Sequence, residues 1–348
     1  NGSGGDASGM FFLPLGQAEL EYQLGEVQSA LASNRPAARG DKSIAQDFGR
    51  LLFDSLFEGP ILQVYRRNQA YQTQGNQTIR LNIEPPELDA LPWELLYDRQ
   101  TESFLALSRA SALVRYVPAR QAPAPPLGLT PPLHMLVALA SPSGLPPIDL
   151  DRGLDQLQLA VSDLARGGLL EMSIVRGPDT LRAFRRALRT QHAHLLHFIG
   201  HTWNDQKKDD SGLVFEDSDG DAINVEASVL AMLIDQPTLR MIYLDTPGGQ
   251  LLPSSSAGGM VASALLRRGV AAVVSGQRPA TDDRHIDFVR TFYEALAEGL
   301  PVNLAITEAR KTFTFLSRSA AWSAPTLYTN LTDLPLFTIV APLPTIPN

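Results

Sequence analysis

Two short apolar runs constrain the fold of this chain most, and each ends abruptly at polar or turn-forming residues. They are HLLHFIGH at residues 194–201 and LRMIYLD at residues 239–245. Short runs that are rich in branched and aromatic residues, without clean alternation, are typical of strands buried on both faces of a parallel sheet. Because ligands and chemistry collect at the carboxyl ends of such strands, we expect Gly200, His201 and residues 245–249 to share one sheet edge.

The sequence after residue 132 alternates strictly between strand and helix patterns. Apolar residues recur at helical spacing between the predicted strands, as in Leu154, Leu157, Val161 and Leu164. Repeated β-α-β units predict an α/β fold with a mostly parallel sheet, helices on both faces and right-handed crossovers. The predicted strands cover residues 134–140, 169–175, 194–201, 239–245, 270–275 and 336–340.

The sequence before this alternation predicts a small α+β subdomain. It contains a predicted strand at 10–16, a polar stretch, an amphipathic helix at 44–57 and further strands at 78–84 and 112–117. Six prolines between Pro118 and Pro132 predict a stiff, extended connection, since proline fixes φ and removes a donor. We therefore divide the chain into a linker or cloning remnant (1–9), an N-terminal α+β subdomain (10–117), a proline-rich connection (118–132) and an α/β core (133–345).

Composition excludes several classes of function. The chain has 37 acidic and 29 basic residues, a net charge of −8 and no block of Lys or Arg, which disfavours nucleic-acid binding. No apolar run approaches the roughly 18 residues of a membrane span, and we find no signal-peptide pattern. We therefore expect a soluble, cytoplasmic protein that does not bind membranes. The chain has no cysteine, so disulfides and thiolate metal sites are excluded.

Six segments, taken in order and spacing, resemble the CHAT family of caspase-like proteins. The resemblance covers about residues 79–328 and implies the caspase-haemoglobinase fold, a three-layer α/β sandwich with a mostly parallel central sheet. For active members it implies a Cys-His dyad that hydrolyses peptide bonds. It also implies association with sensor, repeat or other regulatory domains, often in prokaryotic defence or signalling. The segments are IRLNIEPPELDALPWELLYD (79–98), FLALSRASALVRY (104–116), LHMLVALASPSGLPPIDLDR (133–152), HLLHFIGH (194–201), GVAAVVSGQRPATDD (269–283) and WSAPTLY (322–328).

The resemblance assigns the dyad histidine to His201 in FIGH. The second family motif, an apolar strand running into Leu-Asn-Ala-Cys, falls on Leu-Asp-Thr-Pro at residues 244–247, so Pro247 stands where the nucleophilic cysteine is expected. Proline offers neither a nucleophile nor an amide hydrogen, which breaks the dyad. His201 could still act as a base, and the amides of Gly200, Gly248 and Gly249 could line an anion-binding hollow.

Three polar groups near the vacant position have two interpretations each. Asp245 occupies the position at which some related caspase-like peptidases, the metacaspases, have an acid that binds a basic P1 side chain. The alternative interpretation of Asp245 is a carboxylate that caps a turn. Thr246 could replace the nucleophile only with strong local activation; otherwise its hydroxyl belongs to an ordinary turn. Ser254, Ser255 and Ser256 fit a mobile linker better than a catalytic role.

Two patterns suggest metal sites, but neither supports one well. His192, His194, His197 and His201 are close in sequence, but strand alternation places the first two and the last two on opposite faces. Residues 217–221, DSDGD, resemble a calcium loop, but their glycine comes fourth rather than sixth, so we predict a hairpin turn. We therefore expect no metal and no cofactor.

The leading hypothesis is a pseudo-peptidase that acts as a binding, scaffolding or regulatory module with a protein or peptide partner. An alternative is a cysteine endopeptidase of the CHAT family seen without its cysteine, which would hydrolyse peptide bonds after basic residues. A third hypothesis keeps the cleft as a receptor for a peptide or small ligand through Asp245.

Overall fold

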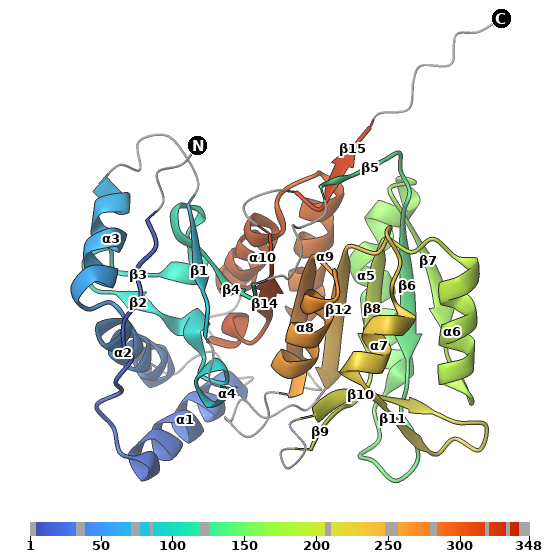
Figure 1. Cartoon of the computed structure of the whole chain (residues 1–348), viewed down its shortest axis with the longest axis horizontal. Coiled ribbons are helices and arrows are strands. Elements are labelled where there is room, and N and C mark those ends of the chain that lie inside the picture. The colour runs from blue at the N-terminus through green and yellow to red at the C-terminus, as the bar shows by residue number, and fades with distance from the viewer. Residues whose placement is uncertain are drawn as a thin grey trace, which may run out of the picture.

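An eight-stranded sheet organises the computed structural model, in the order β1-β4-β14-β13-β12-β8-β6-β7 (Figure 1). Neighbouring strands are parallel except for the antiparallel pair β13–β14, which confirms the predicted mostly parallel α/β sheet. The strands are β1 (Thr78–Leu81), β4 (Ala112–Tyr116), β6 (Leu133–Leu139), β7 (Leu170–Val175), β8 (Leu195–Ile199), β12 (Met241–Pro247), β13 (Ala272–Arg278) and β14 (Thr326–Thr329). The structure describes residues 5–32, 39–70, 77–83, 86–118, 125–205, 210–247, 257–278, 284–316, 320–331 and 335–340.

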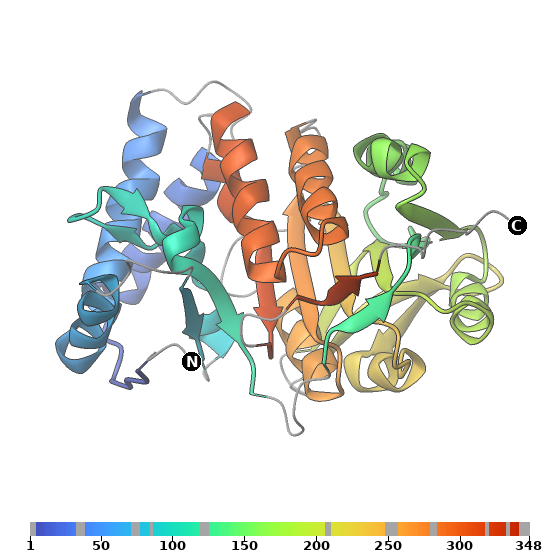
Figure 2. The same ribbon diagram turned by 90° about the horizontal axis from the view of Figure 1, so that it is seen from above.

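Helices cover both faces of this sheet (Figure 2). Alternate residues of β6 enter different hydrophobic clusters: Val137 belongs to the cluster that includes residues of α5, α9 and α10, whereas Leu136 belongs to the one that includes residues of α6, α7 and α8. The three layers predicted from the sequence are therefore present. The helices are α5 (Leu150–Arg166), α6 (Thr180–Thr190), α7 (Ala227–Leu233), α8 (Ala257–Arg267), α9 (Arg284–Ala297) and α10 (Val302–Leu316).

Helix α5 shows how the sequence determines an element of this core. The carboxylate of Asp149 accepts a hydrogen bond from the Arg152 amide at 3.0 Å and so caps the first turn. The apolar stripe predicted from the sequence is buried against the sheet. The helix ends at Gly167, and the next residue, Gly168, adopts a φ of +67°, which glycine tolerates best.

The N-terminal part begins without a helix or strand and continues with helices from Gln17 onward. No strand forms at 10–16, and Met10 and Phe12 are 100% and 77% exposed, so that prediction is wrong: the segment has no strand to pair with. The stretch that follows is a helix, which buries Leu24 and Val27. Its elements are α1 (Gln17–Ala32), α2 (Arg39–Leu56), α3 (Gly59–Ala70), α4 (Pro86–Asp89) and the hairpin of β2 (Tyr97–Asp98) and β3 (Ser103–Phe104).

The main sheet continues into this N-terminal part. Strand β4 pairs in parallel with β14 and with β1, so strands on both sides of the proline-rich connection belong to one sheet. The domain boundary at 118–132 stays a prediction, although the sheet itself does not end there.

Buried charges join the N-terminal part to the core. The Arg115 guanidinium on β4 donates to the Glu94 carboxylate at 2.7 Å and lies 3.2 Å from an Asp89 oxygen. Asp89 also accepts the hydroxyl of Tyr328 on β14 at 2.9 Å. Nη2 of Arg310, on α10, lies 4.0 Å from Glu94, and its burial lowers the pKa of that guanidinium to about 10. Residues from the 89–115 segment and from the 310–328 segment therefore meet at one charged cluster.

Smaller sheets flank the main one. Strands β9 (Thr202–Asp205), β10 (Asp210–Glu216) and β11 (Ala222–Glu226) form an antiparallel sheet, and Asp217 accepts the amides of Asp219 and Asp221 in the predicted hairpin turn. The predicted last strand is β15 (Phe337–Ile339), which pairs with β5 (Leu127–Leu129) outside the main sheet. Within the described ranges, no helix is long and apolar enough to span a membrane.

Candidate functional site

The predicted site lies at the carboxyl ends of β8 and β12, two adjacent strands in the middle of the sheet (Figure 1). Their parallel register pairs Ile199 with Asp245. His201 and Pro247 each follow those positions by two residues, so both lie at the same edge of the sheet. The two strands are adjacent and parallel, as expected, and a functional site at their ends stays a prediction.

His201 leaves β8 directly after Gly200 and is partly exposed. Its Nε2 atom lies 2.8 Å from the carbonyl oxygen of Pro146, in the connection between β6 and α5. Because a carbonyl oxygen only accepts hydrogen bonds, Nε2 carries the hydrogen, and Nδ1 of the neutral ring holds the lone pair. The ring is therefore oriented by a backbone group and has an acceptor nitrogen of the kind that a general base uses.

Gly200 permits the close turn at the end of β8. A Cβ atom on this residue would lie 2.6 Å from the ring of Phe198 and 3.1 Å from the Ala140 carbonyl oxygen. Its amide donates to the carbonyl oxygen of Asp245 at 3.2 Å. The proposed role of this amide in an anion-binding hollow is therefore wrong, because the bond to β12 already uses it.

Asp245 is buried beneath the strand ends rather than open to a cleft. It is 2% exposed, and its Oδ2 atom lies 3.8 Å from Nε2 of both His197 and His285. The His197 ring stacks on Tyr243 at a centroid distance of 4.7 Å, and its Nδ1 atom lies 2.8 Å from the Tyr293 hydroxyl. Burial, followed by the charges of Tyr243 and Asp245, raises the pKa of Tyr293 well above its usual value, so that hydroxyl stays neutral.

Helices α5 and α9 close the space around Asp245. The cavity that it shares with Gln156, Leu157 and Val289 has a volume of about 10 Å³. A cavity of this size holds about one water molecule. A lysine or arginine side chain would not fit there, and the arrangement favours the structural interpretation of this carboxylate over the P1-binding one.

Thr246 and Pro247 complete the described end of β12. The Thr246 hydroxyl donates to the carbonyl oxygen of Gly276 on β13 at 3.1 Å, which matches an ordinary structural hydroxyl. Pro247 pairs by register with Arg278 and ends the strand. Gly248 and Gly249, and also residues 254–256, lie outside the described residues.

The clustered histidines occupy different levels of β8. The Nδ1 atom of His194 accepts the amide of His134 at 3.0 Å at the amino end, His197 is buried in the middle, and His201 follows the carboxyl end. One ion could not reach all of them. Across the part of the chain that the structure describes, no group of three His, Cys, Asp or Glu residues is arranged to hold a metal.

His285 and Tyr293 were not predicted from the sequence. Both lie on α9, about 40 residues or more from Asp245 along the chain. His285 lies beside Asp245 and Tyr293 beside His197 because α9 packs over these strands. The sequence offers one local signal for these two residues: polar side chains stand among the apolar residues Phe288, Val289 and Phe292 of a helix. This signal does not indicate which residues they contact.

The sheet, its covering helices and a histidine facing a strand end define a peptidase-like α/β protein without a thiol nucleophile. The CHAT domain model matches residues 46–330, and the chain belongs to the CHAT family of caspase-like proteins. No curated protein sequence matches the chain.

Solved structures with a similar fold include two of the Saccharomyces cerevisiae separase–securin complex. One is 12% identical with a TM-score of 0.44 and covers 90% of this chain, which spans 27% of the matched chain. The other is 14% identical with a TM-score of 0.40, covering 87% of this chain and 20% of that one. The Arg-specific cysteine proteinase gingipain R is 10% identical with a TM-score of 0.43. This match covers 91% of this chain and 76% of the gingipain chain.

Proposed function

We propose that this CHAT domain is a pseudo-peptidase, which recognises a protein or peptide partner at the carboxyl ends of β8 and β12 without hydrolysing it. The observation that carries the proposal is Pro247 at the end of β12, beside the strand that leads to an oriented His201, in a chain that has no cysteine. Hydrolysis through a covalent intermediate needs a nucleophile beside the base. Proline cannot supply one.

The neighbouring groups support the same conclusion. The Thr246 hydroxyl donates to a backbone carbonyl, and the Gly200 amide to the carbonyl of Asp245. Both groups therefore bond to the backbone of neighbouring strands rather than pointing toward a substrate. Among the described residues of this edge, His201 is partly exposed, so recognition there would use its imidazole and the backbone around it.

A cytoplasmic location and control by attached sensor or regulatory domains belong to this proposal. Family membership supports both, since CHAT domains are associated with such modules. A scaffolding role follows from the same reasoning: without a cysteine at the family's nucleophile position, the domain would act through what it binds.

The test is hydrolysis of a peptide library with either acidic, basic or apolar residues before the scissile bond. We expect no cleavage above that seen with His201→Ala, measured by mass spectrometry after prolonged incubation. Cleavage that disappears in His201→Ala would overturn the proposal, because it would reveal a working nucleophile.

The second candidate is a cysteine endopeptidase seen without its cysteine. The orientation of His201 by the Pro146 carbonyl favours it, because a base held in this way serves catalysis. Restoring a thiol at position 247 separates the two, as argued in the Discussion.

A further inference from the structure

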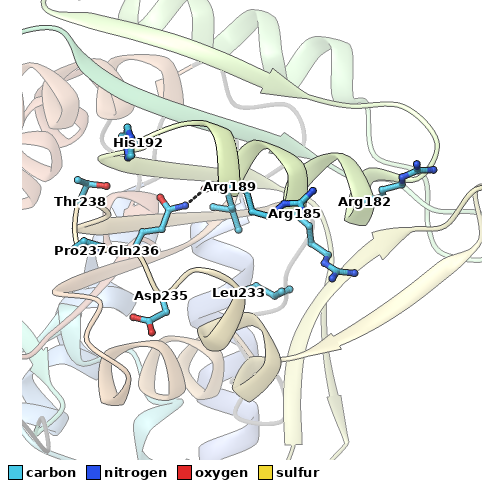
Figure 3. A pocket seen from close by; sticks show the side chains of 10 residues that line it. Arg182, Arg185, Arg189, His192, Leu233, Asp235, Gln236, Pro237 and Thr238 are labelled. Carbon is cyan, nitrogen blue, oxygen red and sulfur yellow. Dashed lines mark hydrogen bonds between the residues drawn. The ribbon is translucent and has the colours of Figure 1, made fainter.

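A groove rich in arginine lies between α6 and the connection from α7 to β12 (Figure 3). Its volume is about 630 Å³. Arg182, Arg185 and Arg189 line one side along α6, with Leu233 and Pro237 on the other. We call this feature the arginine groove.

The groove is a built feature of the fold. The Gln236 side chain donates to the Leu188 carbonyl oxygen and so fixes the α7–β12 connection against the end of α6. Phe184 and Leu188 anchor α6 in the core, which turns the arginines outward. Both walls are therefore held by buried contacts.

Of the arginines on α6, Arg189 lies in the last turn, where a cation favours the helix dipole. Four arginines on α6 are exposed, and each lies three or four residues from two of the others: Arg182, Arg185, Arg186 and Arg189. Like charges at these spacings destabilise a helix. Within the described residues, Arg182 lies 3.8 Å from Asp179, and no carboxylate lies within ion-pair distance of Arg185 or Arg189. In a chain with a net charge of −8, this local excess of positive charge needs another explanation.

We propose that the arginine groove binds an acidic segment of a partner protein. Seven residues separate Arg182 from Arg189, which corresponds to about 10 Å along the helix axis. Carboxylates on alternate residues of an extended peptide lie about 7 Å apart, so two or three of them can span this row. Arginine binds carboxylates in a bidentate manner, and Leu233 and Pro237 offer apolar contact to the intervening side chains.

The arginine groove is separate from the site at His201 and Pro247. His192 precedes β8 and Thr238 precedes β12, so the groove reaches the amino ends of the strands whose carboxyl ends form that site. The inference therefore does not depend on the proposed pseudo-peptidase function, and the failure of one leaves the other intact.

The probe is a fluorescein-labelled hexapeptide of alternating glutamate and alanine, compared by fluorescence anisotropy with the same peptide carrying glutamine. We expect saturable binding of the glutamate peptide only. Arg185→Gln and Arg189→Gln should each weaken it roughly tenfold, since each removes a charge-assisted hydrogen bond. Arg186→Gln is the matched control: it removes the same charge from the same helix, outside the groove, and should change affinity less than about twofold.

A variant that binds the peptide more tightly cannot be explained by misfolding, so it complements the variants that weaken binding. Asp235 is the acidic residue of the groove, and Asp235→Asn should tighten binding by roughly twofold or more, because it removes a repelling carboxylate. Equal losses in Arg186→Gln and Arg185→Gln would overturn the proposal, as they would indicate long-range attraction alone. It would also be overturned by no binding at millimolar peptide, or by tighter binding of inorganic pyrophosphate, which would indicate a phosphate site.

Discussion

The Nε2 atom of His201 lies 2.8 Å from the carbonyl oxygen of Pro146. His201 follows β8, and Pro146 follows β6, the next strand in the sheet. In a nucleophile–base pair, the base is itself oriented by a third group. The proposed base and its orienting acceptor therefore follow adjacent strands, while the proposed nucleophile position on β12 holds proline.

A thiol at position 247 should restore reactivity. We expect Pro247→Cys to form a covalent adduct with a peptide that carries an electrophilic group, and to do so at least roughly tenfold faster than Pro247→Cys/His201→Ala, because the imidazole promotes thiolate formation. Adduct formation is followed by intact-protein mass spectrometry, with circular dichroism as the check on folding.

Thr246→Cys is the matched control for this experiment. It places the thiol one residue earlier on the same strand, where successive side chains point to opposite faces. Its labelling should be slow and indifferent to His201. Equal labelling of Pro247→Cys with and without His201 would show that the histidine does not serve that position.

The sequence predicts the position of the site better than its interior. The apolar runs at residues 194–201 and 239–245 become β8 and β12, and their carboxyl ends put His201 and Pro247 at one edge. The contacts of Asp245 were not predictable, because they come from α9 packing over β12. Periodicity reports which face of an element is buried, not which polar groups meet there.

The fold shows the same difference between local and long-range information. The β-α-β alternation predicts the parallel strands, but β14 is a four-residue strand that pairs antiparallel to β13, and no pattern of its own marks it. Helix α1 carried a usable signal, since Leu20, Leu24, Val27 and Leu31 recur at helical spacing. The main sheet's continuation through β4 and β1 depends on contacts more than 200 residues apart.

Asp245 should contribute to stability as a buried polar partner. We expect Asp245→Asn to lower the free energy of unfolding by about 1–3 kcal/mol, because it weakens the contacts with His197 and His285 inside the core. Urea unfolding measures the change. Asp287→Asn is the control on α9: its pair with Arg290 is partly exposed, and we expect a loss below about 1 kcal/mol. Similar losses for both variants would contradict the buried role.

Arg115 should be essential to the junction between the N-terminal part and the core. Arg115→Met leaves the Glu94 carboxylate, 2% exposed, without its 2.7 Å partner, and should cost about 3–5 kcal/mol of unfolding free energy. Adding Glu94→Gln should recover part of this loss. Arg109→Gln, which breaks an exposed pair with Glu308, should cost at most about 1 kcal/mol. An Arg115→Met loss as small as that of Arg109→Gln, measured by the same urea unfolding, would contradict the expected role.

His194 should make stability depend on pH between about 7 and 5. Burial, followed by the charges of His134 and His192, lowers the pKa of His194 to about 4, and its Nδ1 atom accepts the His134 amide. The unfolded ring titrates near pH 6.5. Because the folded pKa is the lower one, the contribution of His194 is complete above about pH 6.5 and is lost progressively as the pH falls toward 4.

The measurement is urea unfolding at pH 7, 6 and 5 for the wild type and for His194→Gln. The wild type should lose stability across this range, and His194→Gln should lose clearly less, because the glutamine does not titrate. The variant is less stable at pH 7 if the bond to His134 is weakened, but the slope with pH is the deciding quantity. Parallel slopes for the two proteins would show that another group controls the pH response.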